Sequence, residues 1–118
     1  MADTYVIIQG QQYLSSALDW SEVGQDRYFR EALKVEGNKV KVDMTLAPDV
    51  HREHLRGPRN EELAALDITY MKELETGADS SVTIAEKNKL RDVTADPRIA
   101  AAVTPAELKA LTLEVLTA

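Results

Sequence analysis

The chain has 118 residues, of which 44% are hydrophobic, so it can form one compact domain or one domain with a docking arm. Its net charge of −6 argues against a nucleic-acid partner, because phosphates would be repelled by such a surface. It contains no cysteine, which excludes disulfides, thiolate metal sites and cysteine nucleophiles.

The apolar runs are short, which argues against a membrane partner. The longest cover residues 5–8 and 99–103, whereas a spanning helix needs about 20 apolar residues. The first residues lack the basic start and apolar run of a signal peptide. We therefore expect the protein to be made and used in the cytosol, or to be built into a particle assembled there.

The first part, residues 1–46, carries strand signals. Tyr5–Ile8 is rich in β-branched and aromatic residues and is followed by Gln9-Gly10. Farther along, apolar and polar residues alternate on both sides of Gly37-Asn38, where a two-residue loop fits a type II′ hairpin because glycine accepts positive φ. The expected pairs are Val35 with Val40 and Leu33 with Val42, with Lys34 and Lys41 on the solvated face. Residues 21–30 fit either one or two helical turns after a Ser21 cap or the approach to this hairpin.

Most of the aromatic side chains lie close to the N-terminus. Five of the six are Tyr5, Tyr13, Trp20, Tyr28 and Phe29. They can form the core under the hairpin, or some can be exposed anchors for a partner, since Tyr and Trp are enriched at interface hot spots. The first 46 residues are too few to bury five rings without the helices or a partner, so we expect this segment to dock.

The second part, residues 47–118, carries helix signals. Pro48 fits the first turn of a helix over 48–56, where its missing N–H is not needed. Gly57-Pro58 is expected to break that helix, because the residue before a proline disfavours the α region. A longer helix is then expected over 59–76, ended by Gly77 in the left-handed conformation. Its predicted buried stripe is Leu63, Leu66, Tyr70 and Leu74, widened by Ala64 and Met71.

Two further helix starts follow. Thr83 with Glu86 fits a capping box for a short helix through about Val93, and Pro97 enforces a turn after it. Thr104, Pro105 and Glu107 form a stronger start signal, in which Val103 and Leu108 can act as a hydrophobic staple. Leu108, Leu111 and Val115 then define the packing stripe of a terminal helix. The predicted fold is α+β: a small N-terminal hairpin or three-stranded element followed by three or four short helices.

Few residues offer catalytic or metal chemistry. His51 and His54 lie three apart and could share a metal with Asp49 or Glu53, but a solvated helix surface explains them more simply. No glycine-rich phosphate loop is present, and no serine stands in a pattern that suggests a catalytic triad. We therefore expect a non-enzymatic protein with no metal and no cofactor. A small metal-dependent enzyme using the two histidines is a distant alternative.

Asp67 lies on the apolar side of the predicted long helix, between Leu63 and Tyr70. A carboxylate there must be paired or must reach water, because burying it alone costs several kcal/mol. Arg91 and Arg59 are the natural partners, since a guanidinium can hold a carboxylate with two hydrogen bonds. Asp67 either clips two helices together through Arg91 or marks the wet edge of the stripe.

Two polar signatures bracket the helical segment between residues 59 and 97. The first is Arg59-Asn60 followed by Leu63 and Asp67, and the second is Leu90-Arg91-Asp92-Val93 followed by Asp96-Pro97. Together they resemble the C-terminal module of bacteriophage tail assembly chaperones and tail-fibre assembly proteins. In that family an Arg-Asn pair opens one helix, and a Leu-Arg-Asp triplet closes a second before a proline turn. This chain has Ile68-Thr69-Tyr70 and Val82-Thr83-Ile84 where the family commonly carries tryptophans.

The resemblance implies a non-enzymatic phage tail protein that binds a tail or tail-fibre polypeptide and guides its assembly or attachment. The implied structural or interaction residues are Arg59, Asn60, Asp67, Leu90, Arg91 and Asp92. A structural adaptor kept in the virion tail is the main alternative. The expected location is the host cytoplasm during assembly, or the virion tail. The expected partner is a tail or tail-fibre protein, with a possible oligomer within the tail assembly.

Overall fold

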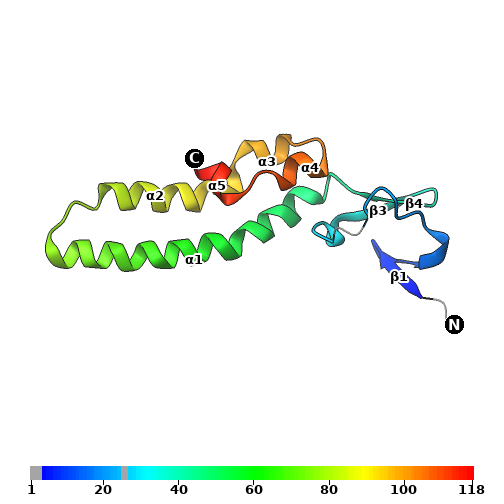
Figure 1. Ribbon diagram of the computed structural model, residues 1–118, viewed down its shortest axis with the longest axis horizontal. Coiled ribbons are helices and arrows are strands. Elements are labelled where there is room, and N and C mark those ends of the chain that lie inside the picture. The colour runs from blue at the N-terminus through cyan, green and yellow to red at the C-terminus, as the bar shows by residue number, and fades with distance from the viewer. Residues whose placement is uncertain (1–3, 25–26) are drawn as a thin grey trace. The chain divides into compact units, whose positions relative to one another are not determined.

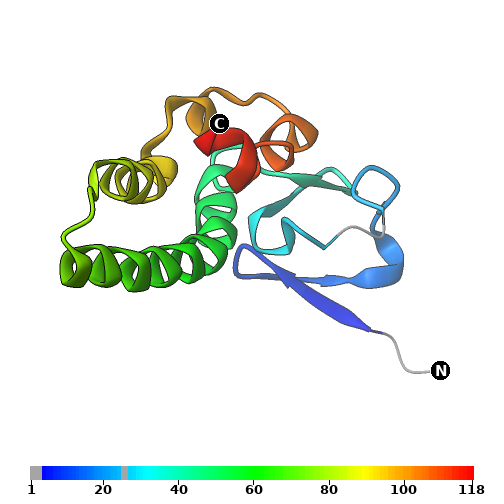
Figure 2. The same cartoon turned by 60° about the vertical axis from the view of Figure 1, so that its left-hand side comes forward.

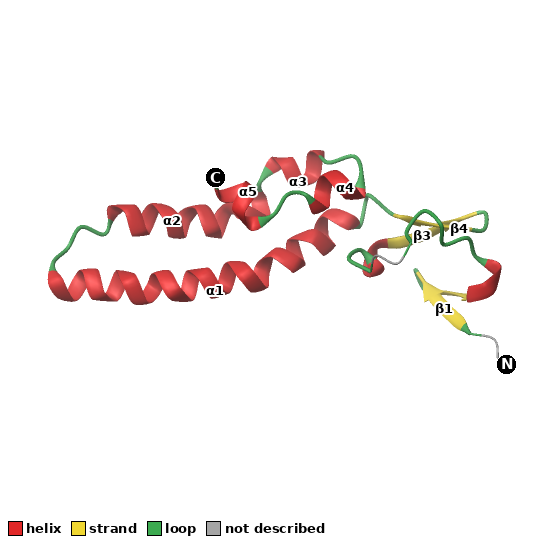
Figure 3. Ribbon diagram, in the orientation of Figure 1, coloured by secondary structure: helices red, strands yellow, loops and turns green. Residues whose placement is uncertain are grey.

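The computed structural model describes residues 4–24 and 27–118, and these divide into two compact units between Val50 and His51. Two small antiparallel hairpins occupy the first unit and helices make up the second (Figures 1 and 3). The predicted α+β class is confirmed. No helix among the described residues is both long and apolar enough to span a membrane.

The first hairpin joins β1 (Tyr5–Ile8) to β2 (Gln11–Leu14) in antiparallel register, with Tyr5 opposite Leu14. Its turn residues, Gln9 and Gly10, have φ of 50° and 79°. Two successive positive φ angles are the requirement of a type I′ turn, whose twist matches that of the strands. The predicted strand at Tyr5–Ile8 is confirmed, and β2 supplies its partner.

The second hairpin joins β3 (Leu33–Glu36) to β4 (Lys39–Val42). The observed register pairs Val35 with Val40 and Leu33 with Val42, as predicted, and Gly37 has a φ of 64°. On the other face Lys34 and Lys41 are only partly exposed, because both pair with the Glu36 carboxylate at 2.9 and 3.3 Å. These lysines lower the pKa of the Glu36 carboxyl, through the hydrogen bond from Lys34 first.

Two short 3-10 segments, Ser15–Ala17 and Arg30–Ala32, flank the region between the hairpins. A backbone bridge joins Asp19 to β4, with the Asp19 N–H donating to the Asn38 carbonyl at 2.7 Å. A turn closes at Gly24, whose N–H donates to the Trp20 carbonyl. The ambiguous stretch 21–30 thus contains a turn and the start of a 3-10 segment, while its residues 25–26 lie outside the described chain.

Helix α1 (Ala47–Thr76) is continuous through Pro58, so the predicted break at Gly57-Pro58 is wrong. Figures 1 and 2 show that α1 bends along its first half. Proline inside a helix typically produces a kink, at a cost of about 3 kcal/mol. Packing on both sides offsets this cost, because Leu55 is buried before the proline and Leu63 is half-buried after it. The exposed Gly57-Pro58 step therefore lies between two helical segments whose apolar side chains are packed.

Helix α1 ends at Thr76, as predicted, with Gly77 at a φ of 69°. Helix α2 (Ser81–Asp92) follows, but its start is not the predicted Thr83–Glu86 capping box. Asp79 instead accepts hydrogen bonds from the Ser81 N–H and hydroxyl, both at 3.0 Å. Thr83 lies inside the helix and is buried, with its hydroxyl donating to Glu73 of α1.

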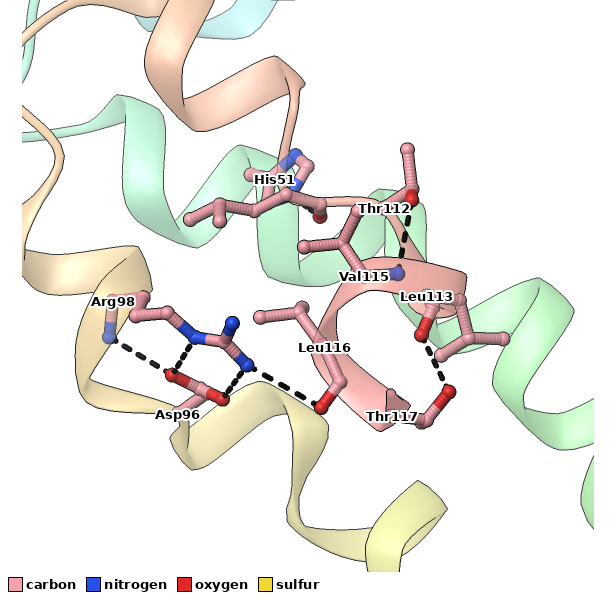
Figure 4. A network of polar contacts seen from close by, with 9 residues as sticks. His51, Asp96, Arg98, Thr112, Leu113, Val115, Leu116 and Thr117 are labelled. Atoms are coloured by element: carbon pink, nitrogen blue, oxygen red, sulfur yellow. Dashed lines mark hydrogen bonds and ion pairs between the residues drawn. The ribbon is translucent and has the colours of Figure 1, made fainter.

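The chain closes with a 3-10 turn (Val93–Ala95) and three short helices, α3 (Pro97–Ala101), α4 (Pro105–Lys109) and α5 (Leu113–Thr117). The predicted cap of α4 is confirmed, since Thr104 accepts from the Glu107 N–H at 3.1 Å. Val103 stays exposed rather than covering Leu108 as a staple. The predicted single terminal helix is wrong, because Thr112 caps α5 by accepting from the Val115 N–H (Figure 4).

The core of the second unit lies where α5 and the 3-10 turn contact α2, and where the start of α1 meets the α4–α5 link through His51 and Leu111 (Figure 1). Its buried side chains are His51, Leu55, Leu90, Val93, Ile99, Leu108 and Leu116. Val115, predicted in the packing stripe, is exposed, and Leu116 takes its place. Asp96 caps α3 and holds Arg98, whose guanidinium also reaches the Leu116 carbonyl at 3.4 Å (Figure 4).

Candidate interaction surfaces

Strand β1 presents apolar side chains to solvent on one of its two faces. Tyr5 is 57% exposed and Ile7 is 75% exposed, whereas Ile8 is buried. Side chains alternate along a strand, so Tyr5 and Ile7 share one face. In the part of the chain that the structure describes, β1 has β2 as its one ladder partner, so its other edge carries no ladder hydrogen bonds, and β3 approaches β1 without pairing with it. Such an edge is the kind of surface to which a further strand can add.

The five N-terminal aromatics fall into three groups. Phe29 is a core residue, and Tyr28 packs on it edge-to-face with ring centroids 4.8 Å apart. Tyr13 and Trp20 are half-buried, and the Trp20 indole N–H donates to the Ser15 carbonyl at 3.0 Å. Tyr5 is the exposed member. The two interpretations of the aromatic group therefore apply to different residues.

An open groove of about 930 Å³ lies in the same unit. Its apolar lining includes Val6, Ile8, Trp20, Leu33 and Leu46. Two arginines, Arg27 and Arg30, also line it, and the Arg27 guanidinium lies 5.8 Å from the Trp20 ring centroid. The groove runs beside β1, so a segment bound along this strand could also place side chains in it.

In the second unit, α1 beyond Asn60 and helix α2 form a helical hairpin, which we call the arm (Figures 1 and 2). Polar contacts join its two helices. Lys87 of α2 pairs with the Asp67 carboxylate at 2.6 Å and lies 4.9 Å from the Tyr70 ring centroid, and Thr83 bonds Glu73. The predicted Asp67–Arg91 clip within the chain is therefore wrong. Lys87 is the partner, and Arg91 donates to Asn88 on its own helix.

The predicted buried stripe of the arm is only partly correct. Leu63, Leu66 and Tyr70 are half-buried, and Tyr70 contacts Lys87 of α2. Met71 and Leu74 are 60% and 61% exposed, and Ala64 is also exposed. The reason is that α2 runs along only one side of this part of α1, where Lys87 and Thr83 contact it (Figure 1). Ile68, Val82 and Ile84 are further exposed apolar side chains of the arm.

The remaining signature residues have local roles in the described structure. The Arg59 guanidinium donates to the Asn60 side-chain oxygen at 3.2 Å, so this pair bonds internally. Leu90 is buried in the core, while Arg91 and Asp92 at the end of α2 are exposed. Within the Leu90-Arg91-Asp92 triplet, the leucine therefore packs in the core and the two charged residues face solvent.

His51 is buried, contrary to the prediction of a solvated surface, whereas His54 is exposed. The His51 Nε2–H donates to the Leu111 carbonyl at 2.7 Å, in the link between α4 and α5 (Figure 4 shows His51). The neighbouring Arg52 donates to the Thr94 carbonyl at 2.9 Å. The described residues contain no group of three or more His, Asp or Glu side chains placed to hold a metal ion. The periodicity of α1 alone did not reveal this burial, because α4 and α5 cover the histidine from about 60 residues away.

Burial lowers the pKa of the His51 imidazole below its ordinary value of 6.5, and the Leu111 hydrogen bond opposes this only in part. The unfolded chain therefore takes up this proton at a higher pH than the folded chain. The resulting stability is complete above about pH 6.5 and declines as the pH falls toward the lower folded value. We expect urea unfolding to show lower stability at about pH 5.5 than at about pH 7.5. The slope should shrink in His51→Gln and persist in His54→Gln.

The carboxylates act in a different pH range. Hydrogen bonds from Arg98 and Ser81 lower the pKa values of Asp96 and Asp79, respectively, so their contributions are lost only below about pH 4. A slope between pH 7.5 and 5.5 that was identical in all three proteins would contradict the assignment to His51.

No protein-family model, curated protein or solved structure was found to match this chain. The expectation of a tail assembly protein therefore depends on the two polar signatures alone.

Proposed function

We propose that this chain is a non-enzymatic phage tail protein that binds a tail or tail-fibre polypeptide and guides its assembly or attachment. The observation that carries the binding role is the exposed face of β1, formed by Tyr5 and Ile7 beside an apolar groove. Exposed Tyr and Ile side chains on an open strand edge suit an extended segment of another chain, since backbone bonds supply affinity and side-chain pockets supply specificity. The tail assignment is supported by the signatures around Asp67 and Arg91.

Co-expression with the tail and tail-fibre polypeptides of the phage tests this proposal. We expect one of them to co-purify with the chain and to become more soluble in its presence. Replacing Tyr5 and Ile7 together with serine should abolish co-purification. The matched control is Val103→Ser with Val115→Ser, which removes two exposed apolar side chains of the second unit. Failure of every tail polypeptide to bind, or equal losses in both double variants, would contradict the proposal.

Mass spectrometry of purified particles then separates the two modes of action. A transient assembly helper should be absent from finished virions. A structural adaptor should be present in fixed stoichiometry with its partner. The measurement decides between these modes without depending on which surface binds.

A further inference from the structure

The arm carries two matching stripes, one on each helix. On α1, Asp67, Met71 and Leu74 are spaced at i, i+4 and i+7, and on α2 the same spacing joins Ile84, Asn88 and Arg91. Residues with this spacing share one helix face. All six residues are exposed, and Asp67 also forms an ion pair with Lys87. Each stripe has an apolar end toward the tip of the arm and a charged end toward the core.

The two stripes lie on the same side of the arm. Lys87 pairs with Asp67 of the α1 stripe, and Asn88 of the α2 stripe is the next residue in the chain, so the two stripes are adjacent there. The opposite side holds an open hollow of about 390 Å³, lined by Ala65, Leu66, Glu86, Lys89 and Leu90. Thr117 of α5 also lines this hollow, so the C-terminal helix approaches the arm from the hollow's side and leaves the stripes uncovered.

The contacts between α1 and α2 fix the axial register of the two helices, that is, which residues lie at the same level along their axes. Because Lys87 meets Asp67 and Tyr70 while Thr83 meets Glu73, Ile84 lies level with Met71 and Asn88 lies level with Asp67. Arg91 lies about one helical turn, roughly 5 Å, from Asp67 toward the core. A second arm packed face to face, with its tip at the same end, would place its α2 stripe against this α1 stripe.

We propose that this chain forms a two-fold dimer through the stripes of the arm, with Asp67 of each copy facing Arg91 of the other. Met71 and Leu74 of one copy then pack on Ile84 of its partner, so apolar side chains meet apolar ones at equal height. Every helix has antiparallel neighbours, which is the common arrangement of a four-helix bundle. The contact is the same in both directions, as two-fold symmetry requires.

Charge complementarity favours a second copy as the occupant. Asp67 is 59% exposed although it pairs with Lys87, so its carboxylate can accept a further donor. Arg91 is exposed on the same side, with a hydrogen bond at 3.3 Å to the uncharged Asn88. The dimer contains two Asp67–Arg91 ion pairs related by the two-fold axis, so both charges of each copy are paired. This dimer surface is separate from the β1 surface proposed to bind a tail polypeptide, since it uses neither Tyr5 nor Ile7.

A mixing experiment on the full chain tests the dimer. Sedimentation equilibrium of the wild type should show a reversible dimer. Asp67→Arg and Arg91→Asp should each weaken self-association roughly tenfold or more, because each dimer then contains two like-charge contacts. An equimolar mixture of the two variants should regain the affinity of the wild type, because both contacts in the mixed dimer join opposite charges. A pair confined to one chain could not be rescued by mixing.

Two controls complete the design. Lys89→Glu changes charge on the hollow side of α2 and should leave the dimer constant unchanged, whereas Met71→Ser with Ile84→Ser should weaken it. A wild type that stays monomeric at up to roughly 1 mM would overturn the proposal. So would a mixture that fails to recover, or binding of a tail polypeptide, in place of a second copy, to these same side chains.

Discussion

Replacing His51 with alanine is expected to lower the free energy of unfolding by about 2–4 kcal/mol. The imidazole is almost fully buried, and its N–H satisfies the Leu111 carbonyl at 2.7 Å. The substitution leaves both a cavity and a buried acceptor that has lost this donor. Chemical denaturation monitored by circular dichroism gives the free energy directly.

His54→Ala is the matched control for this change. It lies three residues away on the same helix and is exposed, so its effect should stay within about 0.5 kcal/mol. Equal effects of the two substitutions would show that His51 does not anchor the link between α4 and α5. The sequence predicts that both histidines are surface residues, and the prediction is correct for His54 and wrong for His51.

Replacing Pro58 with alanine is expected to raise the free energy of unfolding, by up to about 3 kcal/mol. Pro58 lies inside α1 and has no N–H to donate to the carbonyl four residues earlier. Both Pro58 and Gly57 are exposed, and a Cβ added at Gly57 would meet no atom within 4 Å, so side chains do not crowd this step. Thermal and denaturant unfolding both measure the change.

Pro105→Ala is the control for the proline prediction. Pro105 occupies the first turn of α4, where the missing N–H costs nothing and the fixed φ favours the helix. Its replacement should therefore destabilise the protein, by about 0.4–1 kcal/mol. If Pro58→Ala were also destabilising, the bend in α1 would be required by the packing on its two sides.

Features that depend on neighbouring residues are predictable from the amino-acid order. The β3–β4 register follows from the two-residue turn at Gly37-Asn38, because that turn pairs Glu36 with Lys39 and therefore Val35 with Val40. The end of α1 followed from Gly77, and the start of α4 followed from Thr104. In each case the decisive contacts lie within a few positions along the chain, where backbone geometry and capping act.

Side-chain burial and the choice of ion-pair partners depend instead on how distant helices pack. The continuity of α1 through Pro58 depends on packing at both flanks, and the burial of His51 depends on the distant α4–α5 link. The partner of Asp67 is Lys87 rather than Arg91, because the height at which α2 crosses α1 selects between two cations on one helix. Met71 and Leu74 are exposed because α2 covers one side of α1. Helical periodicity shows which side chains share a face, but only the arrangement of the other helices determines whether that face is buried.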